Sequence, residues 1–368
     1  MSNIGLYIHI PFCDGKCAYC SFFSKKGGKN ELDSYAENLI RILGVWGERI
    51  NRTVDTVYFG GGTPSLLGHD RLIRILERSC ESFDIADNAE ITVEVNPTST
   101  RELDFTALRE AGFNRLSIGL QSSNDNELSI LGRRHSAADA AETVKRAQKA
   151  GFDNISLDVM LAVPGQTPEN LDGTLDFCAS LGVQHLSSYI LKIEENTPFY
   201  SRKDTLGLFS DDEQAAFYEQ AVNKLSSLGY EQYEISNFSL PGRESRHNLH
   251  YWRDEEYLGL GPSAHSFLDG KRFYYESDFE SFYRNETVFE SEGGDSEEYI
   301  MLALRLREGL IFSEYEARFN RPVSDKLIEA ARLLGKNGLC TVSDKAIALT
   351  VKGFLVSNSV IAYLSENT

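Results

Sequence analysis

The sequence predicts an α/β protein: a mostly parallel sheet of about six strand–helix units, followed by a smaller α+β part. Two observations support this prediction. Over the first 240 residues, short β-rich segments alternate with longer segments that show helical spacing of apolar residues. Such alternation is typical of βαβ units in a parallel sheet, either open or closed into a barrel. From about residue 211 the alternation ends, which indicates a different organisation for the rest of the chain.

Six short apolar segments have the length and β-branched content of strands. They are Gly5–Ile10, Val54–Phe59, Ile91–Val95, Arg115–Leu120, Ile155–Leu161 and His185–Leu191. The segments between them have the apolar spacing of helices, and several stop at a glycine, which favours a helix end. These predicted helices are Leu32–Ile50, Arg71–Phe83, Thr100–Ala111, Asp125–Leu131, Ala137–Ala150 and Pro168–Leu181.

The last third of the chain predicts a smaller domain. A helix over Glu213–Leu228 is followed by a stretch rich in Tyr, Trp, His and Gly up to about residue 270. Further helices are expected at Glu297–Leu306 and Ser313–Arg318. The tail, Leu327–Leu364, has the pattern of a helix, a short two-stranded element and a second helix, which resembles a winged-helix-like module. Because the chain is acidic, we favour a capping role for this module over DNA binding.

The formal net charge of −18 over 368 residues makes the chain strongly acidic. Such a surface repels phosphate backbones and anionic lipid, so we expect neither nucleic acid nor membrane insertion. No apolar run approaches the roughly 18–20 residues that span a bilayer, and the start, MSNIGLYIHIPFC, lacks the features of a signal peptide. We therefore expect a cytoplasmic protein, in which cysteines serve metal binding or catalysis more often than disulfides.

Three of the six cysteines lie within eight residues, as Cys13, Cys17 and Cys20 in a C-x3-C-x2-C pattern. Three thiolates on one loop suit three corners of a [4Fe–4S] cluster and leave the fourth iron open, for the amino and carboxylate groups of S-adenosylmethionine. The alternatives are a zinc site with a remote fourth ligand and free thiols, although structural zinc usually uses C-x2-C pairs on separate knuckles. The cysteines at positions 80, 178 and 340 are isolated and are expected in the core or on a neutral surface.

Unusual residues mark the carboxyl ends of the predicted strands, where parallel sheets and barrels bind their ligands. They are Pro11–Cys20, Gly60–Pro64, Glu94–Asn96, Gln121 and Asp158. The glycines at 60–62 lack Cβ atoms, so the backbone there can approach a ligand or make a tight turn. Glu94 is expected to bond ribose hydroxyls or an amino group, or to form a surface salt bridge instead. Asp158 lies in an apolar run and needs a partner, for which we expect a hydroxyl or Arg133.

The cysteine spacing resembles that of the radical S-adenosylmethionine superfamily. The flanking residues Tyr7, His9 and Tyr19 resemble its oxygen-independent coproporphyrinogen oxidase group. The resemblance covers most of the chain and rests on six further motifs. They are FGGGTPS at 59–65, EVNP at 94–97, SIGLQS at 117–122, LGRRH at 131–135, LDVM at 157–160 and PGQT at 164–167.

This resemblance implies a partial (β/α)6 barrel over residues 1–240 and a C-terminal domain over 241–368 that ends in the winged-helix-like module. It also implies that S-adenosylmethionine binds beside the cluster, in contact with nine residues. These are Tyr7, Tyr19, Gly61, Gly62, Thr63, Glu94, Gln121, Arg133 and Asp158. His9, which is adjacent to the cysteine loop, is expected to pack structurally.

Two features depart from the oxidase itself. The oxidase pattern has a fourth cysteine two places after the third, where this chain has Phe22, and a long extension before its tyrosine, where this chain has six residues before Tyr7. Both features resemble the HemW heme-chaperone branch instead. So does Ser245–Trp252, which matches the H-N-x-x-Y-W signature of that branch, together with YEISNF at 233–238, YLG at 257–259 and GPSAHS at 261–266.

This second resemblance implies a heme carrier that delivers heme to an acceptor protein, with the cluster, its electron donor and S-adenosylmethionine regulating transfer, and it assigns no catalytic residue. Imidazole ligates heme iron and aromatic rings cover the macrocycle, so His247, Tyr251 and, ranked lower, His250 are candidate heme contacts. Hydrogen bonding within a loop and core packing are their alternatives. The alternative functions are the oxidase or a related radical enzyme that modifies tetrapyrroles, and a purely structural metal protein.

Overall fold

The computed structural model describes residues 3–367, and its centre is a parallel sheet made of the six predicted strands. Each strand pairs in parallel with the next along the chain. The strands are β1 (Ile4–Ile10), β2 (Thr53–Gly61), β3 (Asp84–Val95), β4 (Arg115–Gln121), β5 (Ile155–Leu161) and β6 (His185–Ile190). The predicted α/β fold class is therefore confirmed, with β3 starting earlier than expected.

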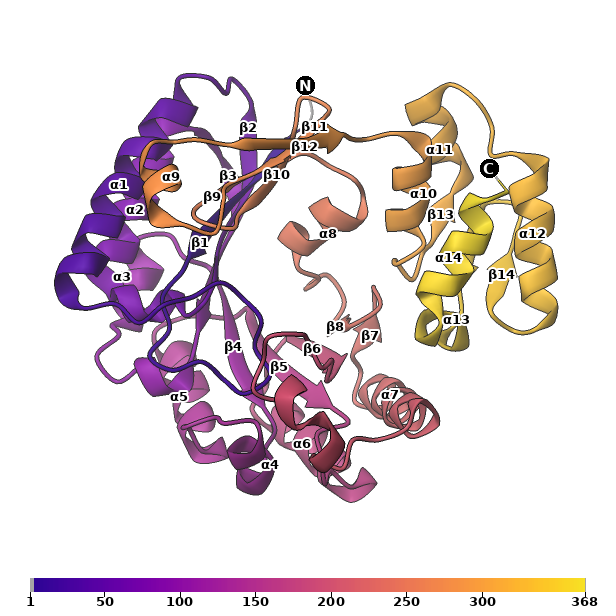
Figure 1. Ribbon diagram of the computed structural model, residues 1–368, viewed down its shortest axis with the longest axis horizontal. Helices are drawn as coiled ribbons and strands as arrows, with labels where there is room; N and C mark the ends of the chain where they lie inside the picture. The colour runs from indigo at the N-terminus through magenta and orange to yellow at the C-terminus, as the bar shows by residue number, and fades with distance from the viewer. Residues whose placement is uncertain (1–2, 368) are drawn as a thin grey trace.

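Seven helices cover the outer face of this curved sheet (Figure 1). They are α1 (Lys29–Gly47), α2 (His69–Ser82), α3 (Phe105–Glu110), α4 (Asp125–Ile130), α5 (Ala137–Lys149), α6 (Pro168–Ser180) and α7 (Asp211–Ser227). Side chains alternate across each strand, so Leu6 and Ile8 belong to the buried apolar core whereas the intervening Tyr7 is on the other face. Helix α3 is shorter than predicted because Asp104 caps it, accepting hydrogen bonds from the amides of Thr106 and Ala107.

Short strands that the sequence pattern missed extend the sheet at both edges. They are β7 (Glu231–Gln232), β8 (Asn237–Ser239), β9 (Tyr257–Leu260), β10 (His265–Leu268), β11 (Lys271–Tyr274) and β12 (Val288–Glu292). The full strand order is β12-β11-β10-β9-β1-β2-β3-β4-β5-β6-β8-β7, with β9 parallel to β1 and the other added strands antiparallel. Within the described residues β12 and β7 do not pair, so the barrel is unclosed, as expected.

Two short helices also lie in this stretch. Helix α9 (Phe279–Tyr283) packs near α1, whereas α8 (Arg246–Trp252) contacts β1 and β2. Figure 1 shows α8 on the inner side of the curved sheet, where it lies between the strands and the C-terminal helices. The H-N-x-x-Y-W signature thus lies on a helix that faces the barrel interior.

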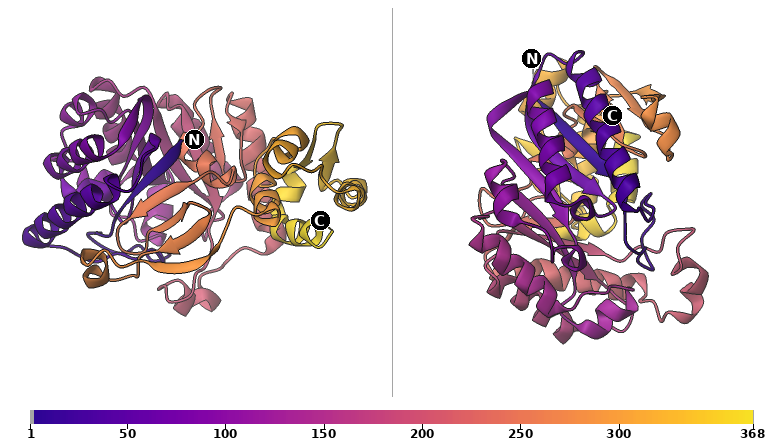
Figure 2. Two further views of the ribbon diagram at one scale, coloured as in Figure 1. Left: turned by 90° about the horizontal axis from the view of Figure 1, so that it is seen from above. Right: turned by 90° about the vertical axis from the view of Figure 1, so that its left-hand side faces the viewer.

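The chain ends in a separate unit built on a three-stranded sheet of order β13-β15-β14 (Figure 2). Its elements are α10 (Ser296–Ala303), β13 (Leu310–Ile311), α11 (Phe312–Phe319), α12 (Asp325–Lys336), β14 (Cys340–Val342), β15 (Ala346–Leu349), α13 (Val351–Leu355) and α14 (Ser357–Ser365). This is the predicted helix, two-stranded element and helix, with β13 as a third strand. The domain division at residue 240 stays a prediction, and the large sheet itself continues to Glu292.

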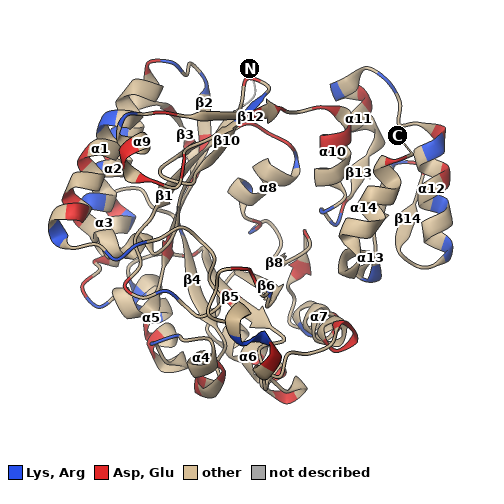
Figure 3. Ribbon diagram, viewed as in Figure 1, with Lys and Arg blue, Asp and Glu red and all other residues tan. Residues whose placement is uncertain are grey.

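Charged side chains of both signs occur along the outer helices, while the strands carry few (Figure 3). None of the helices in residues 3–367 combines the length and the apolar character needed to cross a membrane.

Candidate functional site

The cysteine loop connects β1 to α1 and is held at its base by backbone hydrogen bonds. The amide of Cys13 donates to the carbonyl of Lys25 (3.0 Å), and the amide of Lys25 donates to the carbonyl of Pro11 (2.9 Å). Inside the loop, the amide of Cys20 donates to the carbonyl of Cys17 (3.2 Å), which makes a tight turn. The three cysteines are thereby held close to the carboxyl end of β1.

All three cysteines line one cavity of about 170 Å³ at the carboxyl ends of the parallel strands. Eleven of the twelve residues predicted to hold the cluster and S-adenosylmethionine line it: Cys13, Cys17, Cys20, Tyr19, Gly61, Gly62, Thr63, Glu94, Gln121, Arg133 and Asp158. Tyr7 is the exception, since it stacks on Tyr58 with 6.1 Å between ring centroids. Its hydroxyl lies 3.1 Å from Nδ1 of His9, which is buried and packs structurally, as expected.

The glycines after β2 allow the cysteine loop to approach. A Cβ on Gly62 would lie 2.5 Å from the carbonyl oxygen of Phe12, a backbone atom of the loop. Gly61 has φ of +115°, and a Cβ there would lie 2.7 Å from the ring of His9. Both positions therefore require glycine because the chain itself comes close there, a reason that the sequence pattern did not reveal.

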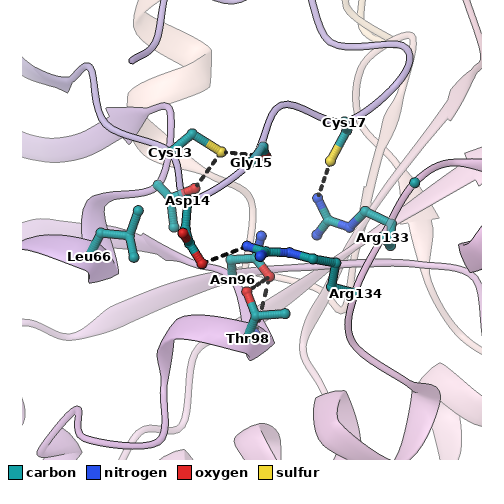
Figure 4. A pocket seen from close by; sticks show the side chains of 11 residues that line it. Cys13, Asp14, Gly15, Cys17, Leu66, Asn96, Thr98, Arg133 and Arg134 are labelled. Carbon is teal, nitrogen blue, oxygen red and sulfur yellow. Dashed lines mark hydrogen bonds and ion pairs between the residues drawn. The ribbon is translucent and has the colours of Figure 1, made fainter. Parts of the chain in front are cut away.

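Two arginines after α4 contact the cysteine loop (Figure 4). Arg133 donates from Nη1 to Cys17 Sγ (3.5 Å) and from Nη2 to the carbonyl of Gly119 (2.6 Å), and its buried Nε has no partner. Arg134 pairs with Asp14 at 2.7 Å on the rim. These contacts hold the cysteine loop against the segment that follows α4.

Two carboxylic acids share the inner wall of the cavity. Glu94 accepts hydrogen bonds from the hydroxyl of Tyr58 (2.9 Å) and the amide of Gly61 (3.2 Å), so the alternative of a surface salt bridge is wrong. Asp158 accepts from the hydroxyl of Ser117 (3.3 Å), as expected. Burial and repulsion from Asp158 raise the pKa of Glu94 to about 7, and burial raises that of Asp158 to about 6. The wall therefore gains negative charge near neutral pH.

The donor set fits a cluster with one thiolate on each of three irons. Among residues 3–367, no three His, Cys, Asp or Glu side chains are arranged to hold a single metal ion. A four-iron cluster instead takes its thiolates at separate corners and leaves the iron without a cysteine open. Cys13, Cys17 and Cys20 would hold it, and Arg133 lines the same cavity beside Cys17.

The candidate heme contacts lie elsewhere, on α8. His247 is buried, with Nδ1 2.8 Å from the hydroxyl of Thr56 and Nε2 2.8 Å from the hydroxyl of Tyr251. Its ring also stacks on Tyr58, with 5.1 Å between centroids. Ligation of iron by His247 thus requires breaking one of these hydrogen bonds, and the assignment stays a prediction.

His250 forms a buried ion pair. Its Nε2 lies 2.7 Å from a carboxylate oxygen of Asp55, and its Nδ1 lies 2.9 Å from a carboxylate oxygen of Glu255. The contact with Glu255 lacks the geometry of a hydrogen bond. Burial alone lowers the pKa of His250, but the two carboxylates outweigh it and raise the pKa to about 9. His250 is therefore a cation at neutral pH, and it has to lose a proton before it can bind iron.

This pair predicts a pH-dependent stability. Because the pKa of His250 is raised from 6.5 to about 9, its stabilisation is complete below pH 6.5 and is lost as the pH rises through 9. We expect about 3 kcal/mol of unfolding free energy to be lost over this range. Asp55→Asn should remove most of this pH dependence in urea denaturation. A matched control is His265→Gln, which removes an exposed pair with Glu290 (3.5 Å); equal slopes in all three proteins would contradict the expectation.

Several residues that line the site were not among those predicted from the sequence. The hydroxyl of Tyr189 donates a hydrogen bond to Gln121 Oε1 (2.9 Å) and so fixes the Gln121 side chain. The backbone φ of Gln121 is +74°, which is unusual for a residue other than glycine. Arg115 and Ser117 lie on the same face of β4 as Gln121. The polar residues at alternate positions of this strand were a usable signal, since period two places them on one face. Nothing in the sequence pattern singled out Tyr189.

Comparisons with known proteins agree with this arrangement. Residues 7–178 match the Radical SAM superfamily, and residues 296–356 match the HemN C-terminal domain. A solved structure described as coproporphyrinogen III oxidase (HemN) from Escherichia coli has the same fold, with a TM-score of 0.84, 23% identity and coverage of 99% of this chain and 90% of that one.

Two curated relatives cover nearly the whole chain, and both are named heme chaperone HemW. The protein of Lactococcus lactis is 34% identical, covering 96% of this chain and 95% of the relative. The protein of Bacillus subtilis is 33% identical, covering 98% of this chain and 99% of the relative. With the cysteine loop, the unclosed barrel and the C-terminal unit, this similarity shows that the chain belongs to the HemW family of the radical SAM superfamily.

Proposed function

We propose that this protein binds heme and transfers it to acceptor proteins, and that it carries a [4Fe–4S] cluster on Cys13, Cys17 and Cys20 with S-adenosylmethionine beside it. The observation that carries the proposal is the full-length similarity to relatives named heme chaperone. It spans both the cysteine loop and α8, so the two candidate sites come from one family rather than from separate resemblances.

In the cluster site, this chain's residues have distinct tasks. Arg133 donates to Cys17 Sγ from Nη1 and to the carbonyl of Gly119 from Nη2, which fixes its guanidinium at the wall of the cavity. Glu94 offers a carboxylate to hydroxyl or amino groups of S-adenosylmethionine, and Tyr189 fixes the Gln121 side chain. When bound, the cluster supplies an electron to the sulfonium, whose carbon–sulfur bond can then break.

Phe22 supports a carrier rather than the oxidase. It occupies the position of the fourth cysteine in the oxidase pattern, and its side chain is 65% exposed at the mouth of the cavity. A large apolar side chain in contact with water is often part of a binding surface. Here it lies where a flat apolar ligand or an acceptor protein would approach the cluster.

Heme titration tests the proposal. We expect anaerobically purified, cluster-loaded protein to bind one heme per protein chain, with a shifted Soret band. If His247 ligates the heme iron, the shift of the Soret band should be lost in His247→Ala, because alanine has no imidazole nitrogen to bind the iron. A Soret band that survives unchanged in His247→Ala would remove this residue from the site. A His9→Ala variant controls for loss of a buried histidine that contacts the neighbouring Tyr7.

The oxidase alternative is tested with the same preparation. Reduced, cluster-loaded protein is mixed with coproporphyrinogen III and S-adenosylmethionine, and protoporphyrinogen IX is measured. We expect no product beyond the background without protein. Formation of product at catalytic rates would overturn the carrier proposal, whereas heme binding without product would support it.

A further inference from the structure

A second, larger cavity of about 450 Å³ occupies the interior of the curved sheet. It shares a wall with the cluster-side cavity, including Glu94, Asp158 and Tyr189. Cys20 to Phe22 and the segment after β6 line it, and Phe22 is exposed. Tyr58, Arg115 and Asn248 also line it, and because Arg115 is buried we call their part of the cavity its inner end. This volume lies within the range of about 300–1,000 Å³ that is usual for pockets that bind small molecules.

The inner end contains an arginine without a partner. Arg115 is 2% exposed, and its Nε forms no hydrogen bond. Within residues 3–367 its guanidinium forms no ion pair either. Glu94 and Asp158 face the same cavity, but their hydrogen bonds go to Tyr58, Gly61 and Ser117 instead. Both carboxylates attract the Arg115 guanidinium through space, but neither forms an ion pair or hydrogen bond with it, so its donors stay free for a ligand in the cavity.

Other donors surround Arg115. Thr92, which pairs with Arg115 across β3 and β4, has a buried hydroxyl without a partner. Asn248, one position after His247 in the H-N-x-x-Y-W signature, lines the same cavity from α8. The backbone amides that start α8 are held by Glu90, which accepts from the amides of Arg246 (3.2 Å) and His247 (3.1 Å). The position of Asn248 is therefore anchored independently of any ligand.

We propose that the inner end of this cavity binds the carboxylate of an organic ligand, with Arg115 as its ion-pair partner and Asn248 as a further donor. A guanidinium matches a carboxylate through two parallel hydrogen bonds. Two sources share this chemistry: a propionate group of heme, which rests on the proposed function, and a free small carboxylate, which does not.

The test compares heme with heme dimethyl ester, in which both propionates are masked. The full-length protein is expected to bind heme at least about tenfold more tightly than the ester, the usual loss for a charge-assisted hydrogen bond. In Arg115→Gln this ratio should fall to near one. Sodium propionate forms a second arm: at constant ionic strength it should raise the melting temperature of the protein but not of Arg115→Gln.

Matched variants separate an effect on ligand binding from effects on folding and on the net charge of the protein. Lys326→Gln removes the same charge from α12, where the lysine is exposed and does not line the cavity, and should leave the ratio unchanged. Arg146→Gln, whose guanidinium donates to two carbonyls at 2.8 Å, should lower the melting temperature, whereas Arg115→Gln should not. Arg115→Lys keeps the charge without the paired donors and serves if the glutamine variant does not fold.

The outcomes distinguish the proposed heme-binding function from the proposed carboxylate site at Arg115. Ester discrimination that depends on Arg115 supports the site with heme as its ligand. Failure of heme to bind, together with propionate stabilisation that depends on Arg115, would refute the proposed function and leave the carboxylate site standing. The inference is overturned if wild-type protein shows neither effect, or if both effects persist in Arg115→Gln.

Discussion

Replacement of Cys17 by serine is expected to abolish the cluster. Cys17 lines the cavity with Cys13 and Cys20 and is the cysteine contacted by Arg133. A hydroxyl is a far weaker ligand for iron than a thiolate, and two remaining thiolates would leave two irons without protein ligands. We expect iron and acid-labile sulfide to fall more than about tenfold relative to wild type after anaerobic purification, with loss of the brown colour.

Cys80→Ser is the matched control for this change. Cys80 lies on α2, is exposed and is remote from the cysteine loop, so its loss should leave the iron content unchanged. Metal analysis of the wild-type protein distinguishes the cluster from the alternative of a zinc site on the three cysteines. One equivalent of zinc and no iron would contradict the cluster, as would a Cys17→Ser protein that retains its iron.

The affinity for S-adenosylmethionine is expected to rise with pH and to level off above about pH 7. Glu94 has its pKa raised to about 7 by burial and by the nearby Asp158, so below that pH the side chain is mostly neutral. A bound cation favours the carboxylate form of Glu94, so binding of S-adenosylmethionine below pH 7 releases a proton. The affinity for S-adenosylmethionine therefore rises by up to about tenfold for each pH unit in that range. Equilibrium dialysis of cluster-loaded protein between pH 5.5 and about 8.5 measures this.

Glu94→Gln should bind S-adenosylmethionine at least about tenfold more weakly at pH 8 and without this pH dependence. Glu127→Gln is the control, because Glu127 is a buried glutamate outside the cavity that accepts hydrogen bonds from Ser122 (2.7 Å) and Gln166 (3.0 Å). The cluster content is measured at each pH, since loss of iron would mimic loss of affinity. An unchanged pH profile in Glu94→Gln would show that another group titrates.

Much of the central fold was predictable because its signals are local. Each parallel strand is a short apolar run, and each helix has its own apolar spacing and stop. The edge strands were missed for the same reason. Strands such as β7 and β13 have only two residues, and β9 pairs with β1 across about 250 residues of chain, so no local pattern announces them.

The sequence by itself determined the cysteine loop, the strand-end positions of Gly61, Glu94 and Gln121, and the family. Each of these depends on the spacing of neighbouring residues. Only the tertiary structure decided which polar groups are already satisfied. It places both ring nitrogens of His247 in hydrogen bonds and leaves Nε of the buried Arg115 without a hydrogen-bond partner. The physical reason is that a partner for a buried polar group comes from distant strands and helices, which only folding brings together.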